Sequence, residues 1–219
     1  MSNLRPELAA IADMIRPGTR VLDVGCGDGA LLEHLVRAKG VDGRGIEISQ
    51  QNVNACVARG LSVVQGDADT DLAEYPAGVF DAVILSQTIQ ATEKPERVLT
   101  DMLRIGRRVA VSLPNFGYWK VRLSLALLGR MPRTRTLDYN WYDTPNIHLC
   151  TLADFVDLTQ KMGTIIVEAH TLDDAGRTRR MQPYAVNRGF FGPNLQAPGA
   201  IFLLKKNERS PDSAQASPR

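Results

Sequence analysis

The chain has 219 residues, of which 44% are hydrophobic and 23% charged, and its formal net charge is +2. This length suits one buried α/β core and is short for two, and the ordinary composition excludes a fibrous or wholly disordered protein. The small basic excess does not favour a nucleic-acid binder, which usually presents a strongly basic face.

The start of the chain and its cysteines favour a cytoplasmic protein. Residues 1–7 lack the basic start and apolar core of a secretory signal. Cys26, Cys56 and Cys150 are odd in number and far apart, which is typical of reduced thiols rather than of a disulfide framework or a zinc site. The same cysteine spacing gives no reason to expect a bound metal. The longest apolar run, 123–128, is far below the ~20 residues that cross a bilayer, so we expect no membrane span.

The first half of the chain alternates β-rich runs with stretches of helical periodicity. Ser49 is a suitable helix N-cap, and Pro95 suits a first helical turn. Strands that alternate with helices of this length predict an α/β fold, in which a mostly parallel sheet carries helices on both faces. The expected strands are 20–24, 43–48, 61–65, 80–85 and 108–113, and the expected helices are 30–38, 49–59 and 95–105.

The pattern changes after Asn115. We expect a mostly apolar helix at 118–128, an irregular stretch over 131–150, a helix at 152–162, and strands at 164–169 and 200–204. Because aromatic and arginine side chains are enriched at interface centres, residues 116–150 are expected to form a lid or a partner-docking insertion. The alternative is an ordinary core helix with a solvated basic flank. We predict a single domain over 1–206 and a disordered tail over 207–219.

A glycine-rich loop follows the first predicted strand and opens a helix. Its sequence, Gly25-Cys26-Gly27-Asp28-Gly29-Ala30, is typical of a tight turn that lets a ligand lie against the backbone. The same residues fit a dinucleotide motif, and Glu47 follows at about the 20-residue spacing that suits a ribose in either case. The glycines alone therefore do not identify the ligand.

Asp23 favours S-adenosylmethionine or S-adenosylhomocysteine over a dinucleotide. It lies two residues before Gly25, where a dinucleotide would place its pyrophosphate and where carboxylates of Asp23 and Asp28 would repel it. S-adenosylmethionine has no phosphate and carries an ammonium and a sulfonium group, which suit acidic residues. The alternative is a buried Asp23 that is hydrogen-bonded to loop amides, and the two interpretations are compatible.

Further candidates follow the other strands, at the edge where open α/β sheets bind ligands. Glu47 is expected to accept hydrogen bonds from both ribose hydroxyls; the alternative is a surface carboxylate. Asp67, with Ala68 beside it, is expected to accept a hydrogen bond from the adenine amino group; the alternative is a turn aspartate. Ser86 and Gln87 are expected to line the methionine end. The predicted ligand-binding set is Asp23, Gly25, Cys26, Gly27, Gly29, Glu47, Ile48, Asp67, Ala68, Ser86 and Gln87.

Four segments together resemble the class I S-adenosylmethionine-dependent methyltransferases. The resemblance covers about 20–113 and implies a Rossmann-like fold with a seven-stranded sheet, whose last strand is an antiparallel insertion. The segments are 21–29, Glu47, 66–68 and 80–84.

Four further segments are less generic: 85–92, 112–119, 141–148 and 152–155. Together they resemble the MetW family of methionine-biosynthesis proteins, and this closer resemblance extends to about Ala169. It implies a chain that acts with homoserine O-acyltransferase as a partner in acyl-homoserine formation, and it identifies no methyl acceptor. The first functional hypothesis is therefore a regulatory subunit that binds S-adenosylmethionine, and the alternative is a methyltransferase acting on a small molecule. A homodimer is compatible with either.

Catalytic signals are weak. Methyl transfer depends mainly on positioning of the acceptor, and a base is needed only if the acceptor loses a proton. The Asn-Pro-Pro-aromatic motif of amino-group methyltransferases does not follow the fourth strand, and Pro114-Asn115-Phe116 resembles it only loosely. His148 is the best candidate base, although a loop histidine bonded to backbone is the simpler interpretation.

Overall fold

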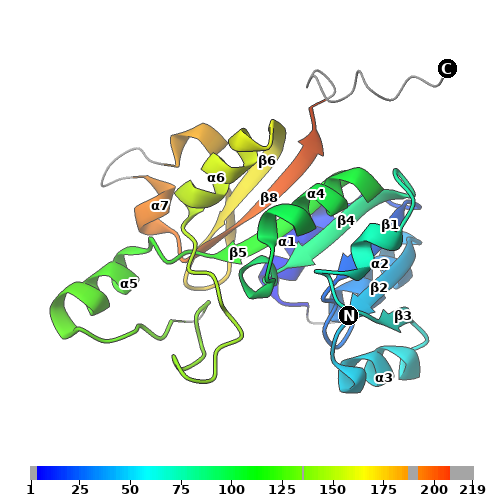
Figure 1. Ribbon diagram of the computed structural model, residues 1–219, viewed down its shortest axis with the longest axis horizontal. Coiled ribbons are helices and arrows are strands. Elements are labelled where there is room, and N and C mark those ends of the chain that lie inside the picture. Colours follow the sequence, from blue (N-terminus) through cyan, green and yellow to red (C-terminus); the bar gives the residue numbers. More distant parts are fainter. Residues whose placement is uncertain (1–3, 135, 187–191, 208–219) are drawn as a thin grey trace.

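A computed structural model describes residues 4–134, 136–186 and 192–207. Its centre is one sheet with the strand order β3-β2-β1-β4-β5-β8-β6-β7 (Figure 1). The strands are β1 Arg20–Val24, β2 Asp42–Glu47, β3 Ser62–Gln65, β4 Phe80–Ser86, β5 Gly106–Pro114, β6 Thr164–Leu172, β7 Thr178–Arg180 and β8 Gly199–Lys206.

Strands β1 to β5 are parallel, and β8 lies antiparallel between β5 and β6. The predicted α/β class and the antiparallel insertion are therefore confirmed. The predicted number of seven strands is wrong for the described residues, because a short edge strand, β7, pairs with the end of β6. Its sequence, Thr-Arg-Arg, is exposed throughout and has none of the apolar alternation by which a strand is recognised.

Helices cover both faces of the sheet because alternate strand residues point to opposite sides. Leu22 and Val24 pack with α4 and α6, whereas Val21 packs with α1 and α2. The helices are α1 Pro6–Met14, α2 Ala30–Lys39, α3 Gln50–Ala58, α4 Pro95–Ile105, α5 Trp119–Leu123, α6 Leu152–Lys161 and α7 Pro193–Gln196, with short helical turns at Asp71–Glu74, Ile89–Ala91 and Pro183–Ala185.

Most predicted elements lie within a few residues of their expected bounds. Helix α4 has the bounds predicted from Pro95, and Ser49 caps α3 by accepting from the Asn52 amide at 3.5 Å. Helix α1 was not predicted. The expected helix at 118–128 is regular only over α5 and continues as a π-helical stretch, Ser124–Leu128. No described helix combines the length and apolarity needed to cross a bilayer.

The segment 116–150 leaves the sheet at the end of β5 and returns at the start of α6, and in Figure 1 its α5 projects away from the sheet. Its two ends meet where the Phe116 amide donates to the Cys150 carbonyl at 3.1 Å. Tyr118 and Val121 are buried, but the following leucines are exposed, so this segment is not an ordinary core helix. We call residues 116–150 the insertion.

Asn115 holds the base of the insertion. Its side chain is fully buried, and its Nδ2 donates to the carbonyls of Asn194 and Ala197 at 2.9 and 2.7 Å. Its Oδ1 accepts from the amides of Gly117 and Leu152 at 2.8 and 3.3 Å. One amide thus joins β5, α6 and α7, which gives a structural reason for an asparagine here.

The first prediction is that Asn115→Ala destabilises the fold by about 3 kcal/mol, because it leaves several buried backbone groups without a partner. Urea denaturation measures this. Asn54→Ala, at an exposed position on α3, serves as the matched control and should change stability by less than about 0.5 kcal/mol. Equal effects of the two substitutions would contradict the structural role of Asn115.

Candidate functional site

The glycine loop lies between β1 and α2, at the carboxyl edge of the parallel strands. Gly25, Gly27 and Gly29 have φ values of 66°, 56° and 79°, in the left-handed region that side chains other than glycine rarely adopt. The Gly25 amide donates to the Ile46 carbonyl at 2.8 Å, so the loop is tied to the end of β2. The predicted tight turn is confirmed.

The three glycines differ in what surrounds them. A Cβ on Gly29 would lie 2.6 Å from Leu61 Cδ1, and one on Gly25 would lie 2.9 Å from Thr88 Oγ1. A Cβ on Gly27 would meet nothing within 4 Å. Packing therefore requires Gly25 and Gly29, whereas Gly27 borders open space.

Glu47, at the end of β2, holds the glycine loop in place by a hydrogen bond. Its side chain is 6% exposed, so it is not a surface carboxylate. Oε2 accepts from the Gly27 amide at 2.8 Å, and Oε1 accepts from the Ser49 amide at 2.9 Å. A carboxylate has about four acceptor positions, so these two bonds leave capacity for hydroxyl groups of a ligand.

Asp23 is a buried carboxyl group with no protein donor. It is 2% exposed, and no described residue donates a hydrogen bond to its carboxylate. The loop amide of Gly27 bonds to Glu47 instead, so the predicted bonds from loop amides to Asp23 are not present. Burial, and then the charge of Glu47, raise the pKa of Asp23 to about 7. A buried carboxylate without a partner suits either protonation or a bound cation.

The remaining predicted residues lie along the same edge of the sheet. Asp67 Oδ1 accepts from the Asp69 amide at 2.9 Å, which is the turn geometry considered as its alternative role. Ala68 packs against the core and Ile48 is exposed. Cys26 is a buried thiol beside Leu32, as expected of a small packing residue.

Ser86 ends β4, Gln87 follows it, and both lie near a buried carboxyl group on α1. Gln87 has a φ of 51°, the only non-glycine residue with positive φ among those described. Its Nε2 donates to Glu7 Oε2 at 2.7 Å, and Ser112 Oγ donates to Glu7 Oε1 at 2.5 Å. Ser86 Oγ lies 3.2 Å from Ser112 Oγ. Burial raises the pKa of Glu7, against the lowering effect of these hydrogen bonds.

Sequence reasoning missed Glu7. The available signal was its spacing, since Glu7 precedes Ile11 by one helical turn and so shares the buried face of α1.

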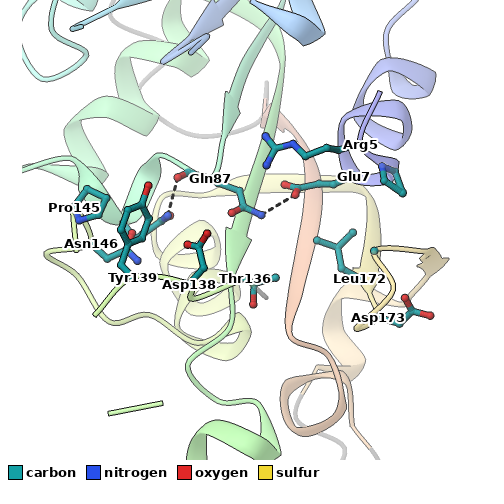
Figure 2. Close-up of a pocket in the computed structure, with 13 residues that line it drawn as sticks. Arg5, Glu7, Gln87, Thr136, Asp138, Tyr139, Pro145, Asn146, Leu172 and Asp173 are labelled. Atoms are coloured by element: carbon teal, nitrogen blue, oxygen red, sulfur yellow. Dashed lines mark hydrogen bonds between the residues drawn. The ribbon is translucent and has the colours of Figure 1, made fainter. Parts of the chain in front are cut away.

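A cavity of about 280 Å³ lies beside Gln87, between α1 and the insertion (Figure 2). Figure 2 shows Glu7 and Gln87 at one side, with Tyr139, Pro145 and Asn146 opposite. Gln90, 5% exposed, also lines it and donates from Nε2 to the Gln87 carbonyl at 2.7 Å. The cavity is lined by Arg5, Pro6, Glu7, Gln87, Gln90, Thr136, Asp138, Tyr139, Pro145, Asn146, Leu172, Asp173 and Gly176.

His148 lies on the exposed part of the insertion and does not line this cavity. Its amide donates to the Gln90 carbonyl at 3.0 Å, and its Nε2 lies 3.4 Å from the Glu93 carbonyl oxygen. These contacts agree with the simpler interpretation of a loop histidine bonded to backbone, and a role as a base stays a prediction.

Solved structures identify the fold of this chain. An S-adenosylmethionine-dependent methyltransferase from Thermotoga maritima superposes with a TM-score of 0.65 at 17% identity, covering 92% of this chain and 88% of that one. Magnesium protoporphyrin IX methyltransferase from Synechocystis, with S-adenosylhomocysteine bound, superposes with a TM-score of 0.59 at 17% identity, covering 91% and 80%. The chain therefore has the class I methyltransferase fold.

Residues 5–204 match the family described as methionine biosynthesis protein MetW. The bifunctional methionine biosynthesis protein MetXA/MetW of Rhodopirellula baltica is 32% identical over 209 residues, which cover 91% of this chain and 32% of that protein. The chain thus spans about a third of the length of this relative. It belongs to the MetW family.

The second prediction concerns the pH dependence of stability. Between about pH 4 and pH 7 the folded chain holds a proton on Asp23 that the unfolded chain has released, so this group lowers the free energy of unfolding as pH rises. Asp23→Asn removes the effect. Comparing urea denaturation of both proteins at pH 4 and pH 8 should show that wild type loses more stability, by on the order of 3 kcal/mol. Parallel pH profiles would contradict the raised pKa.

Proposed function

We propose that the chain binds S-adenosylmethionine or S-adenosylhomocysteine at the glycine loop and acts with homoserine O-acyltransferase in acyl-homoserine formation. The observation that carries the ligand assignment is Asp23, a buried carboxyl group without a protein donor, at the end of β1 beside the loop. The ammonium group of either ligand supplies the missing cationic donor. A phosphate-bearing ligand would place an anion there instead.

The neighbouring residues suit the other parts of such a ligand. Glu47 has unused acceptor positions for ribose hydroxyls, and its bonds to Gly27 and Ser49 hold it in place. Asp67 follows β3 at the same edge, where the Gly66 amide donates to the Glu47 carbonyl at 3.1 Å. Gly27 leaves the space above the loop free. Ser86, which ends β4, and Gln87, which follows it, are proposed to lie near the methionine part.

The third prediction separates ligand binding from fold stability at the glycine loop. Gly27→Ala places a methyl group in the open space above the loop, and we expect the affinity for S-adenosylmethionine to fall at least tenfold by calorimetric titration. Its positive φ costs about 1–2 kcal/mol of stability as well.

Gly18→Ala is the matched control, because Gly18 also has positive φ and open surroundings but precedes β1 at the opposite edge of the sheet. It should lose similar stability and keep its affinity. Unchanged affinity in Gly27→Ala would place the ligand elsewhere.

The partnership rests on the family and on the Rhodopirellula baltica relative, whose name joins MetXA and MetW functions in one chain. Domains that are fused in one protein of one organism commonly bind each other where they occur as separate chains. We infer that the partner of this chain is a homoserine O-acyltransferase in the cytoplasm, as the family resemblance implies.

The insertion is the proposed docking surface. Leu127 and Leu128 are 71% and 70% exposed, and Leu125 is also exposed on the same segment. Trp141 and Tyr142 are exposed further along and stack edge to face with ring centroids 5.7 Å apart. Clusters of exposed apolar and aromatic side chains mark interaction sites more often than isolated ones do.

The fourth prediction tests this surface. The double variant Leu127→Asp with Leu128→Asp should weaken binding to the purified acyltransferase at least tenfold, because each buried leucine stabilises a complex by about 1.5–3 kcal/mol. Val57→Asp, at an exposed apolar position on α3, is the control and should bind normally. S-adenosylmethionine affinity should be unchanged in both. Normal acyltransferase binding by the double variant would exclude this part of the insertion.

A methyltransferase acting on a small molecule is the second candidate, favoured by the cavity that lies next to the end of β4. Transfer of label from S-adenosylmethionine to a metabolite pool would establish it.

A further inference from the structure

One polar atom beside the cavity has no partner. Gln90 is 5% exposed, and its Oε1 is the one side-chain oxygen or nitrogen among the described residues that is itself fully shielded from solvent and lacks a hydrogen bond. Its amide cannot simply be reversed, because Nε2 already donates to the Gln87 carbonyl at 2.7 Å. Leaving a buried acceptor unpaired costs about 1–3 kcal/mol. A donor supplied by a bound molecule would remove this cost.

The charges around the cavity favour a ligand that carries an amino group. Glu7 and Asp138 contribute carboxyl groups and Arg5 one guanidinium group, whereas the carboxylate of Asp173 is paired with Arg177 at 2.7 Å. Glu7 is buried, and Gln87 and Ser112 fix its position by hydrogen bonds. Gln87 also fixes Gln90 through its carbonyl, so one residue positions both acceptors. The strained φ of Gln87 is the kind of backbone conformation that is concentrated at functional sites.

Arg5 adds the opposite charge at the same side of the cavity. Figure 2 shows its guanidinium reaching over Glu7 toward Gln87. Arg5 forms no hydrogen bond or salt bridge with any described side chain, and its charge acts on Glu7, whose pKa it lowers. Its guanidinium donors can therefore bind a carboxylate. One side of the cavity thus carries the guanidinium of Arg5, which can bind an anion, and the oxygen acceptors of Glu7 and Gln90, which can bind a cation.

We propose that this cavity binds a small α-amino acid, with the ammonium group held by Gln90 Oε1 and the Glu7 carboxylate and the carboxylate held by Arg5. The volume of about 280 Å³ is roughly nine times the ~30 Å³ of one water molecule in the liquid, which suits an aliphatic amino acid and is small for a nucleotide. No residue of the glycine loop lines the cavity, but the cavity shares Gln87 with the proposed methionine end of the S-adenosylmethionine site, so binding of the two ligands is measured separately.

Calorimetric titration of the full chain tests the proposal. The probes are L-homoserine, L-methionine and two analogues of homoserine. One analogue is the amino alcohol that lacks the carboxyl group, and the other is the hydroxy acid that lacks the amino group. We expect at least one amino acid to bind, and both homoserine analogues to bind at least tenfold more weakly than homoserine or not at all. Binding of neither amino acid, which is the result for a cavity that holds only water, would overturn the proposal. An analogue that binds as tightly as the amino acid would do the same.

Two variants then locate the binding. Arg5→Gln removes the cation at an exposed position, where substitutions usually change stability little, and Gln90→Leu removes the acceptor with little change of volume. Each should weaken binding of the amino acid at least tenfold, whereas Arg37→Gln, an exposed arginine on α2, should not. Wild-type affinity in Arg5→Gln would overturn the assignment. Because Gln90→Leu also loses a bond to Gln87, its thermal midpoint is measured alongside, and Arg5→Gln decides the result if that variant unfolds.

Titration of the same variants with S-adenosylmethionine distinguishes the cavity from the proposed S-adenosylmethionine site. Arg5→Gln should bind S-adenosylmethionine as wild type does. Loss of S-adenosylmethionine binding by wild type itself would contradict the proposed function and leave the amino-acid site standing on its own titration.

Discussion

The paired hydrogen bonds of Glu47 fix the region on which the proposed function depends. One carboxylate receives the amide of Gly27 from the glycine loop and the amide of Ser49 from the start of α3, so β1, β2 and two helices meet at a single side chain. The Gly27 amide bonds to Glu47 and the Gly25 and Cys26 amides bond to the Ile46 carbonyl, so none of these loop amides is left for Asp23, although Asp23 is nearly fully buried. The negative charge of Glu47 also contributes to the raised pKa of Asp23.

A second network extends this arrangement toward the insertion. Thr88 packs against Gly25, and the preceding residue, Gln87, holds Glu7 through its side chain and Gln90 through its carbonyl. The glycine loop and the cavity are thus separated by one short turn after β4. Open α/β sheets place ligands at the carboxyl ends of their strands, and here that edge carries a glycine-rich loop and a polar cavity side by side.

The sequence predicted most of the sheet and the glycine loop because their signals are local. Strands β1, β4 and β5 are short, mostly apolar runs, helical periodicity separates the strands, and the loop glycines stand within five consecutive positions. The ligand roles of Asp23, Glu47 and Asp67 stay predictions. The cavity could not be predicted, since it needs Glu7 to meet Gln87 and Ser112, residues 80 and 105 positions away. Gln90 shows no sequence signal, because its unpaired oxygen results from burial in three dimensions. Strand β7 was missed because pairing with β6, not its own composition, makes it a strand.

The protonated state of Asp23 has a consequence for the heat of ligand binding. Below about pH 7 the empty site carries a proton on this carboxyl group, and a cationic ligand that binds against Asp23 must displace it. The displaced proton passes to the buffer, so the measured enthalpy includes the ionisation enthalpy of that buffer. Two buffers with different ionisation enthalpies would therefore give different apparent heats at acid pH and converging heats well above pH 7. The slope of apparent heat against ionisation enthalpy counts the protons released and reports directly on the charge of this one side chain.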